Sequence, residues 1–185
     1  MSENTFLPSG YDIPDSSTGY MKFKIGENRF RVLSSAIIGW ESWIKDDEGN
    51  RKPRRWRMDE KINVEDVGDD PKHFWAFVVW NYGVEKIQIL EVTQKGIMKS
   101  IQSLTKDEEW GGPKKYDIVV TREGEGLDTE YQVQPKPKKE LDEGIKQFYK
   151  DLHINLEALY KGEDPFAKDN EVNLSDEDVE EIMKV

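Results

Sequence analysis

Tryptophan and arginine are concentrated in one stretch of the chain, residues 40–57, which reads WESWIKDDEGNRKPRRWR. This stretch holds three of the six tryptophans and six cationic side chains. Cations neutralise phosphates, and exposed aromatic rings stack on unpaired bases, each stack contributing about 1–3 kcal/mol. The polar segment 45–50 should turn the chain, so that Trp40 and Trp43 face Trp56 across a loop or hairpin arm. The pattern therefore favours a single-stranded nucleic acid as the ligand.

A structural role for the same residues is the alternative, because tryptophan is often a core residue and an arginine-rich loop is often only solvated. Five cations between positions 51 and 57 repel one another by roughly tenths of a kcal/mol per pair. The run itself contains no acidic residue that would relieve this repulsion. The repulsion favours an anionic ligand over the structural role.

The predicted contacts follow from these residue types. The predicted phosphate contacts are the cations Arg29, Arg31, Arg51, Lys52, Arg54, Arg55 and Arg57, and a second set, Lys22, Lys24, Lys114 and Lys115, extends them. The predicted stacking residues are the aromatic side chains Trp40, Trp43, Trp56, Trp75 and Phe77. Trp80 falls on the opposite face of the same predicted strand from Trp75, so it is assigned to the core.

Composition excludes several classes of protein. A chain of 185 residues with 36% hydrophobic content can form one domain with appendages, and 35% charged residues leave much of it at the surface. The absence of cysteine excludes disulfides and thiolate zinc sites, and only His73 and His153 could supply imidazole, so we expect neither a metal nor a cofactor. The N-terminus resembles no targeting peptide and no apolar window approaches eighteen residues. A soluble protein in the cytoplasm of its host cell is expected.

Enzymatic motifs are missing as well. The sequence contains no phosphate-binding P-loop, no G-x-S-x-G and no H-E-x-x-H. The glycine-rich segment 122–126 contains two glutamates, which suits a hairpin turn better than a phosphate cradle. We therefore expect a protein that is not an enzyme.

Charge divides the chain into a nearly neutral body and an acidic tail. The net charge is −11, and residues 163–185 hold nine acidic residues and two lysines, a net charge of −7 that leaves −4 for residues 1–162. Within this tail, Ser175 and Asp178 have the spacing of a helix capping box, followed by apolar residues at helical spacing. A short helix that forms on a partner would present Asp176, Asp178, Val179, Ile182 and Met183.

Hydrophobic periodicity predicts mostly strands. Alternation begins after residue 20, with a turn expected at 26–28, and the run 73–82 is apolar on both faces, as in a central strand. Residues 86–92 should form a hairpin with that run, and 116–121 should form another with 129–133. Helical spacing occurs at 93–104 and again in the stripe formed by Leu141, Ile145, Phe148, Tyr149 and Leu152. The second stripe must dock on the barrel or on another copy of the chain, which would make a homodimer.

Five or more short strands with one helix before the last pair predict a mainly β fold, an OB-like barrel with C-terminal helices and an acidic tail. An immunoglobulin-like sandwich is the alternative, but the helix and the missing cysteine pair argue against it. The expected organisation is a flexible segment 1–19, a nucleic-acid-binding core 20–137 with a basic arm at 45–57, a helical segment 138–162 and an interaction tail 163–185.

The run KYDIVVTREGEGLDTEYQVQPKPKKEL, followed by INLEALYKGEDPFA, resembles the closing hairpin and C-terminal part of the single-stranded-DNA-binding, helix-destabilising proteins of tailed phages. The earlier run FKIGENRFRVLSSAIIGWESW resembles the opening strands of that OB-type family. The resemblance implies sequence-tolerant binding of single-stranded DNA in phage replication, recombination and repair. It also implies an acidic C-terminal tail that recruits replication or recombination proteins.

Two features depart from that family. Its best-known members carry a Cys/His zinc site near the binding cleft, whereas this chain has no cysteine and places its basic arm at a similar position. The short basic N-terminal motif that supports cooperative binding in some relatives is also absent from residues 1–19. The sequence therefore indicates a variant without zinc and argues against strong cooperativity.

Two other functions remain compatible with the sequence. OB barrels also bind oligosaccharides, and Trp40, Trp43, Trp75 and Trp110 could serve as sugar platforms. That reading leaves the cations at 51–57 without a role unless the sugar is acidic. An adaptor that binds proteins through the acidic tail and touches no nucleic acid is the third reading.

Overall fold

A computed structural model of the chain describes residues 19–63, 65 and 67–166. Seven antiparallel strands form one sheet, and short helices accompany it, so the predicted mainly β, OB-like barrel is confirmed. The strands are β1 (Gly26–Val32), β2 (Ile37–Lys45), β3 (Arg51–Arg57), β4 (Lys72–Asn81), β5 (Lys86–Val92), β6 (Asp117–Glu123) and β7 (Glu130–Pro135). The predicted partner helix near residue 180 and nearly all of segment 1–19 lie outside the described residues.

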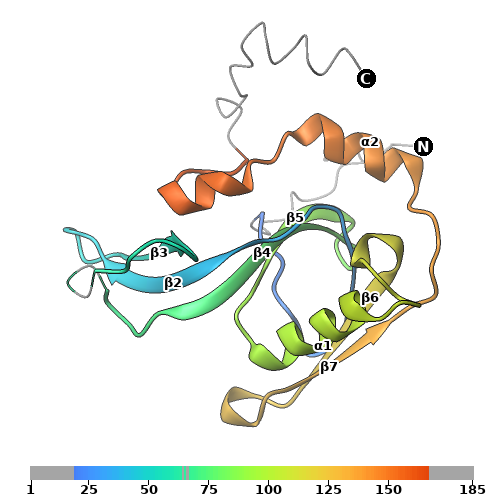
Figure 1. Ribbon diagram of the computed structural model, residues 1–185, viewed down its shortest axis with the longest axis horizontal. Helices are drawn as coiled ribbons and strands as arrows, with labels where there is room; N and C mark the ends of the chain where they lie inside the picture. The colour runs from blue at the N-terminus through green and yellow to red at the C-terminus, as the bar shows by residue number, and fades with distance from the viewer. Residues whose placement is uncertain (1–18, 64, 66, 167–185) are drawn as a thin grey trace, which may run out of the picture.

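Strand β4 organises the sheet, as its apolar sequence predicted. One edge of β4 pairs with β5, while the other edge pairs first with β2 and then, from Val79 to Asn81, with β1. Strand β6 joins β1, and β7 joins β6, while β3 extends β2 outward (Figure 1). Within the described ranges no ladder joins β3 to β7, so the barrel is partly open.

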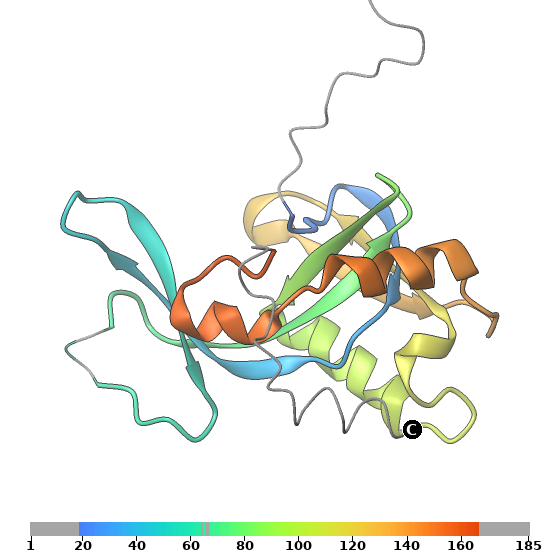
Figure 2. The same cartoon turned by 90° about the horizontal axis from the view of Figure 1, so that it is seen from above.

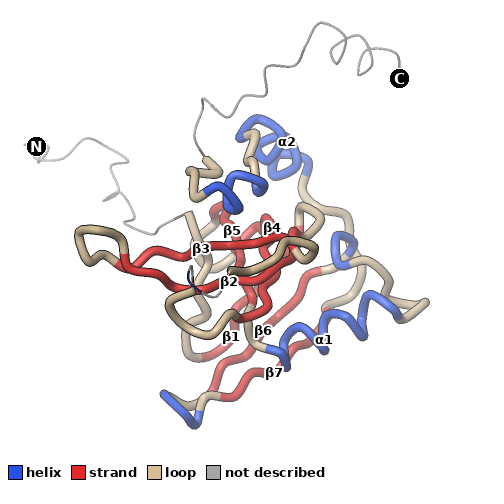
Figure 3. Tube along the Cα trace, turned by 60° about the vertical axis from the view of Figure 1, so that its left-hand side comes forward, coloured by secondary structure: helices blue, strands red, loops and turns tan. Residues whose placement is uncertain are grey.

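The two faces of β4 belong to two separate cores. Phe77 and Val79 pack in one core, while Phe74, Ala76 and Val78 pack in the other. Both faces are buried because successive side chains of a strand point in opposite directions and helices lie on both sides of this sheet. Figure 3 shows α1 (Lys95–Lys106) and α2 (Glu143–Leu152) on opposite sides of the strands.

Helix α1 buries Ile97, Met98 and Ile101 in the first core, which confirms the predicted helix with a shift of two residues. Helix α2 begins at the N-cap Asp142 and covers the second core together with the 3₁₀ helix η4 (Leu156–Lys161). Tyr149 of α2 packs against that core, so this helix docks on the barrel. None of its residues is fully buried, and Phe148 remains 51% exposed.

The predicted turn at 26–28 was wrong. Residues Gly26 to Asn28 instead form the first part of β1 and pair with β6. The Asn28 side chain folds back to hydrogen-bond both the N–H and the C=O of Lys24 and also donates to the Val120 carbonyl. Asparagine at this position therefore anchors the preceding segment to the sheet, a role that its turn propensity conceals.

Candidate nucleic-acid interface

The tryptophan- and arginine-rich stretch forms a β2–β3 hairpin, the arm (residues 37–57), which projects from the barrel (Figures 1 and 2). Trp40 lies directly opposite Trp56, which confirms the predicted facing for this residue, whereas Trp43 lies opposite Pro53 instead. Gly39 permits this arrangement, because a Cβ there would lie 2.0 Å from the Trp56 carbonyl oxygen.

Acidic residues outside the run 51–57, two of them on the arm itself, neutralise most of the arm's cations. The nearest charged atoms are 2.5 Å apart in Arg51–Asp69, 3.2 Å in Lys52–Asp46, 2.5 Å in Arg57–Glu157 and 3.0 Å and 2.6 Å in Arg55–Glu41 and Arg55–Glu91. The repulsion predicted within 51–57 is therefore relieved, by Glu41 and Asp46 on the same hairpin and by acidic residues of other segments, Asp69, Glu91 and Glu157. Arg55 is also buried, which removes it from a ligand's reach.

Three further predicted contact residues are buried. Trp56 is only 4% exposed and lies beneath the Arg54 guanidinium, which is 5.3 Å from its ring centroid. Phe77 belongs to the first core. Arg31 is 1% exposed. The exposure predicted for these three side chains was therefore wrong. Alternation along a strand shows which residues share a face, but it does not show which face a later helix or loop will cover.

Asp117 explains the burial of Arg31. This fully buried carboxylate accepts hydrogen bonds from Arg31 Nε at 2.7 Å, from Arg29 Nη2 at 2.7 Å and from the Tyr82 hydroxyl at 3.0 Å. Burial opposes its ionisation, but the hydrogen bonds from the two arginines outweigh burial and lower the pKa of Asp117. Arg29 remains partly exposed, with its guanidinium over the Tyr82 ring.

A groove opens where the edge of β4 changes partner from β2 to β1. Between the two ladders the Leu33 N–H donates to the Val78 carbonyl and the Val78 N–H donates to the Ser34 hydroxyl, so the connecting segment 33–36 stays close to the sheet although it belongs to no strand. The cavity has a volume of about 710 Å³ and lies between this segment, β4, α1 and the 3₁₀ helix η2 (Pro113–Lys115). Ile38, 45% exposed, and Trp75 line it, and Phe77 forms part of its floor.

A second cavity of about 510 Å³ continues the groove toward the arm, since His73 lines both. Its walls carry Trp40, Lys72 and Lys95. The rings of Trp40 and His73 are 5.4 Å apart, and His73 Nδ1 lies 2.7 Å from the Gly39 carbonyl oxygen. Because a carbonyl only accepts, Nδ1 donates this hydrogen bond and fixes the imidazole beside the tryptophan.

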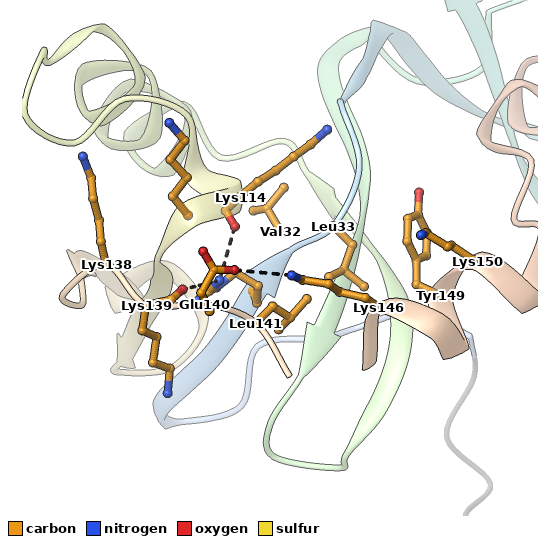
Figure 4. A pocket seen from close by; sticks show the side chains of 12 residues that line it. Val32, Leu33, Lys114, Lys138, Lys139, Glu140, Leu141, Lys146, Tyr149 and Lys150 are labelled. Carbon is orange, nitrogen blue, oxygen red and sulfur yellow. Dashed lines mark hydrogen bonds and ion pairs between the residues drawn. The ribbon is translucent and has the colours of Figure 1, made fainter. Parts of the chain in front are cut away.

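A third cavity, the lysine pocket, adjoins the other end of the groove, and Val32, Lys114 and Lys115 line both. Its volume is about 650 Å³. Figure 4 shows lysines from three segments around it, with Leu33 and Leu141 between them and Tyr149 on α2. Together the three cavities form one path, from Trp40 on the arm to α2, and the walls of this path carry aromatic and cationic side chains.

The structure therefore redistributes the predicted site. Trp40, Trp75, Lys114 and Lys115 lie on this path, whereas Trp43 is 42% exposed on the arm beneath the Arg51 guanidinium. Lys22 and Lys24 line none of the three cavities. Sequence reasoning missed the path residues His73, Lys72, Lys95, Lys138, Lys139, Lys146 and Lys150. The lysine-rich run 136–139 was the available signal, since it holds three lysines just after the last strand.

A probable ssDNA-binding protein of Escherichia phage T5 is 27% identical to this chain over 140 residues. The similarity covers 62% of this chain and 54% of the phage T5 protein, so the chain spans about half the length of that relative. No protein-family profile and no solved structure matches the chain.

The chemistry available on the path is electrostatic and aromatic. In the part of the chain that the structure describes, no three His, Asp or Glu side chains are grouped to hold a metal ion. No helix there has the length and apolar character that a membrane span requires. The path offers flat rings beside ammonium groups, which suits unpaired bases joined by phosphates.

Proposed function

We propose that this protein binds single-stranded DNA, with little sequence preference, along the path from Trp40 to Lys115. The observation that carries the proposal is the presence of rings and cations together on one continuous surface. The rings are Trp40, His73 and Trp75. The cations are Lys72 and Lys95 at one end of the surface and Lys114 and Lys115 at the other. Exposed rings stack on any base, and ammonium groups contact any phosphate, so such a surface does not need a particular sequence.

The arm is proposed as a flanking contact. The side chains of Trp43, Arg51, Lys52 and Arg57 are exposed on the arm. The three cations form ion pairs with acidic residues at the surface, where such a pair contributes about 0–1 kcal/mol to stability. Phosphates can therefore replace those acids at little cost. Arg29 is a further candidate because its guanidinium is partly exposed.

The biological role follows from two likenesses. The phage T5 protein carries the name of a probable ssDNA-binding protein, and the sequence resembles helix-destabilising proteins of tailed phages. We therefore place the protein in phage DNA replication, recombination and repair, as a protein without enzymatic activity. The acidic tail is proposed to recruit partner proteins in those processes.

Titration of tryptophan fluorescence with oligothymidylate at several salt concentrations tests this function. Binding should quench Trp40 and Trp75, and the logarithm of the association constant should fall by about 0.7 per phosphate contact for each tenfold rise in salt. A duplex of the same length should bind more weakly, because its bases cannot reach the rings. Equal affinity for duplex, or an affinity that does not depend on salt, would contradict the proposal, and the second result would favour a neutral oligosaccharide.

A further inference from the structure

The lysine pocket combines an apolar interior with a cationic rim. Val32, Leu33, Leu141 and the Tyr149 ring contribute apolar surface. The rim consists of the six lysines Lys114, Lys115, Lys138, Lys139, Lys146 and Lys150. Within the described ranges Lys114, Lys115 and Lys150 form no ion pair, while Glu140 is the one acidic residue that lines the pocket. A cavity with this lining suits a ligand that is flat and apolar in its middle and anionic at its edges.

The pocket is a built site rather than a chance gathering of surface lysines. Its floor contains Arg31, which is 1% exposed and donates to the main-chain carbonyls of Lys114 and Lys139, at 3.2 Å and 3.1 Å. One buried side chain thus fixes the two segments that carry four of the lysines. Arg31 Nη2 is itself buried without a hydrogen-bond partner, so the floor retains an unused donor.

The Glu140 carboxylate lies beside Lys146, at the position where an anionic group of a ligand would contact this lysine. This carboxylate is 93% exposed and lies 3.3 Å from Lys146 Nζ, which reaches from α2 across the mouth of the pocket (Figure 4). Lys146 also contacts Glu143 at 3.0 Å, so it keeps a partner when Glu140 leaves. An incoming phosphate would therefore exchange with an exposed, weakly held carboxylate.

We infer that the lysine pocket binds a nucleotide unit of the same single strand, with the base on the apolar interior and the flanking phosphates on the lysine rim. This inference rests on the proposed function and extends it. The groove and the pocket share Lys114 and Lys115, so a strand that leaves the groove at η2 enters the pocket without crossing an acidic surface other than Glu140. The path then ends under α2, which carries Lys146, Tyr149 and Lys150.

One consequence is that long and short oligonucleotides make different contacts. A short strand fills the groove alone, whereas a longer strand also bridges the barrel and α2. Helix α2 has no fully buried residue, so this bridge should hold it more firmly on the sheet. The affinity gained beyond a threshold length should depend on the lysines of α2.

An oligothymidylate series from about 4 to about 16 nucleotides, the range of site sizes known for OB folds, tests the inference. Lys146→Gln/Lys150→Gln should leave the binding of the shortest bound oligonucleotide unchanged. For the longest it should lower affinity and flatten the salt dependence by about 1.4, the value for two lost phosphate contacts. The matched control Lys99→Gln/Lys161→Gln removes the same charge from exposed positions that line none of the three cavities and should behave as the unmodified protein.

Glu140→Gln should change the affinity for long oligonucleotides in the opposite direction. Removing the competing carboxylate should tighten the binding of long oligonucleotides roughly 1.5- to 5-fold at low salt, as expected for an exposed charge pair, and leave short ones unaffected. A long oligonucleotide with an abasic terminal unit should bind more weakly than the same oligonucleotide with its base, because a base occupies the pocket. An equal loss of affinity for all lengths in the α2 double variant, or no loss for any, would overturn the inference without refuting the proposed binding of single-stranded DNA by the unmodified protein. Failure of every oligonucleotide to bind the unmodified protein would instead refute the proposed function.

Discussion

At the residue scale, partners decide which cations can meet a ligand. Arg31 and Lys114 are both close to the lysine pocket, but Asp117 holds Arg31 in the interior, whereas no acidic residue in the described part of the chain pairs with Lys114. An arginine forms several directed hydrogen bonds at once, so it suits a buried network, while a lysine at a rim keeps its charge in solvent. The exposed lysines are thus better candidates for phosphate contact than the buried arginine.

The buried network around Asp117 predicts a large loss of stability on mutation. Asp117→Asn removes the negative charge that compensates Arg31 and should lower the free energy of unfolding by about 3–5 kcal/mol, measured by denaturant titration. Asp128→Asn, in the exposed 3₁₀ helix η3 (Gly126–Asp128), should change it by less than about 0.5 kcal/mol. Equal stability of the two variants would show that the network does not hold β1 and β6 together.

Two tryptophans of β4 provide a matched test of stacking. Trp75 lines the groove, and Trp80 packs on the other face of the same strand, against the second core. Trp75→Leu should weaken single-strand binding by about 1–3 kcal/mol without changing its salt dependence, because a stack involves no phosphate. Trp80→Leu should leave affinity unchanged in the same fluorescence or anisotropy titration. The reverse result would place the bases on the opposite face of the sheet.

At the element scale, a buried charge cluster ties the arm to the barrel. Arg55 of β3 bridges Glu41 of β2 and Glu91 of β5, and its guanidinium also lies over the Phe74 ring. Two carboxylates that face one guanidinium cannot both ionise without cost. Burial and the adjacent Glu91 raise the pKa of Glu41 to about 8, against the opposing effect of Arg55.

This cluster predicts a dependence of stability on pH. The pKa of Glu41 is higher in the folded state than in the unfolded state, so the folded protein binds the extra proton and its stability falls as the pH rises from about 5 to about 8. The loss is at most about 5 kcal/mol, since each pKa unit corresponds to about 1.4 kcal/mol. Thermal unfolding at several pH values measures it. Glu41→Gln should flatten the profile, and an unmodified protein whose stability rises over this interval would contradict the assignment.

At the scale of the whole molecule, negative charge is concentrated beyond the barrel. The described residues end at Phe166, whose ring packs edge-on against Tyr20, and the Asn155 N–H donates to the Pro165 carbonyl. The remaining residues, 167–185, hold seven acidic residues and two lysines. We propose that a tail with this charge competes with DNA for the cationic path and also recruits partner proteins.

Removal of residues 167–185 tests both roles while keeping the contacts of Phe166. The truncated protein should bind single-stranded DNA more tightly at low salt, and the difference should shrink toward physiological salt, where the Debye length is about 8 Å. It should also fail to capture replication or recombination proteins in a pull-down assay. Unchanged affinity at low salt would contradict the competition, and undiminished capture would contradict recruitment.

The sequence by itself determined the order and type of most elements. The apolar run of β4, the helical spacing of α1 and the glycine-rich turn before β7 are local signals, and each requires only the chain's own periodicity. The facing of Trp40 and Trp56 was predictable for the same reason, because a polar turn joins two strands of similar length. Residues 26–28 were the exception, where the side chain of Asn28 bonds to the chain instead of forming a turn.

Only the tertiary structure decided which of the candidate residues are available to a ligand. The arm's cations meet Asp69, Glu91 and Glu157, which lie up to a hundred residues away in the sequence. The groove arises where β4 changes partner, and the lysine pocket arises where α2 returns to the barrel. Long-range charge pairing and the covering of one strand face by a distant helix leave no periodic trace in the sequence. The residue types therefore indicated the class of ligand that we propose, while the position of the proposed site depended on the packing of segments remote from one another.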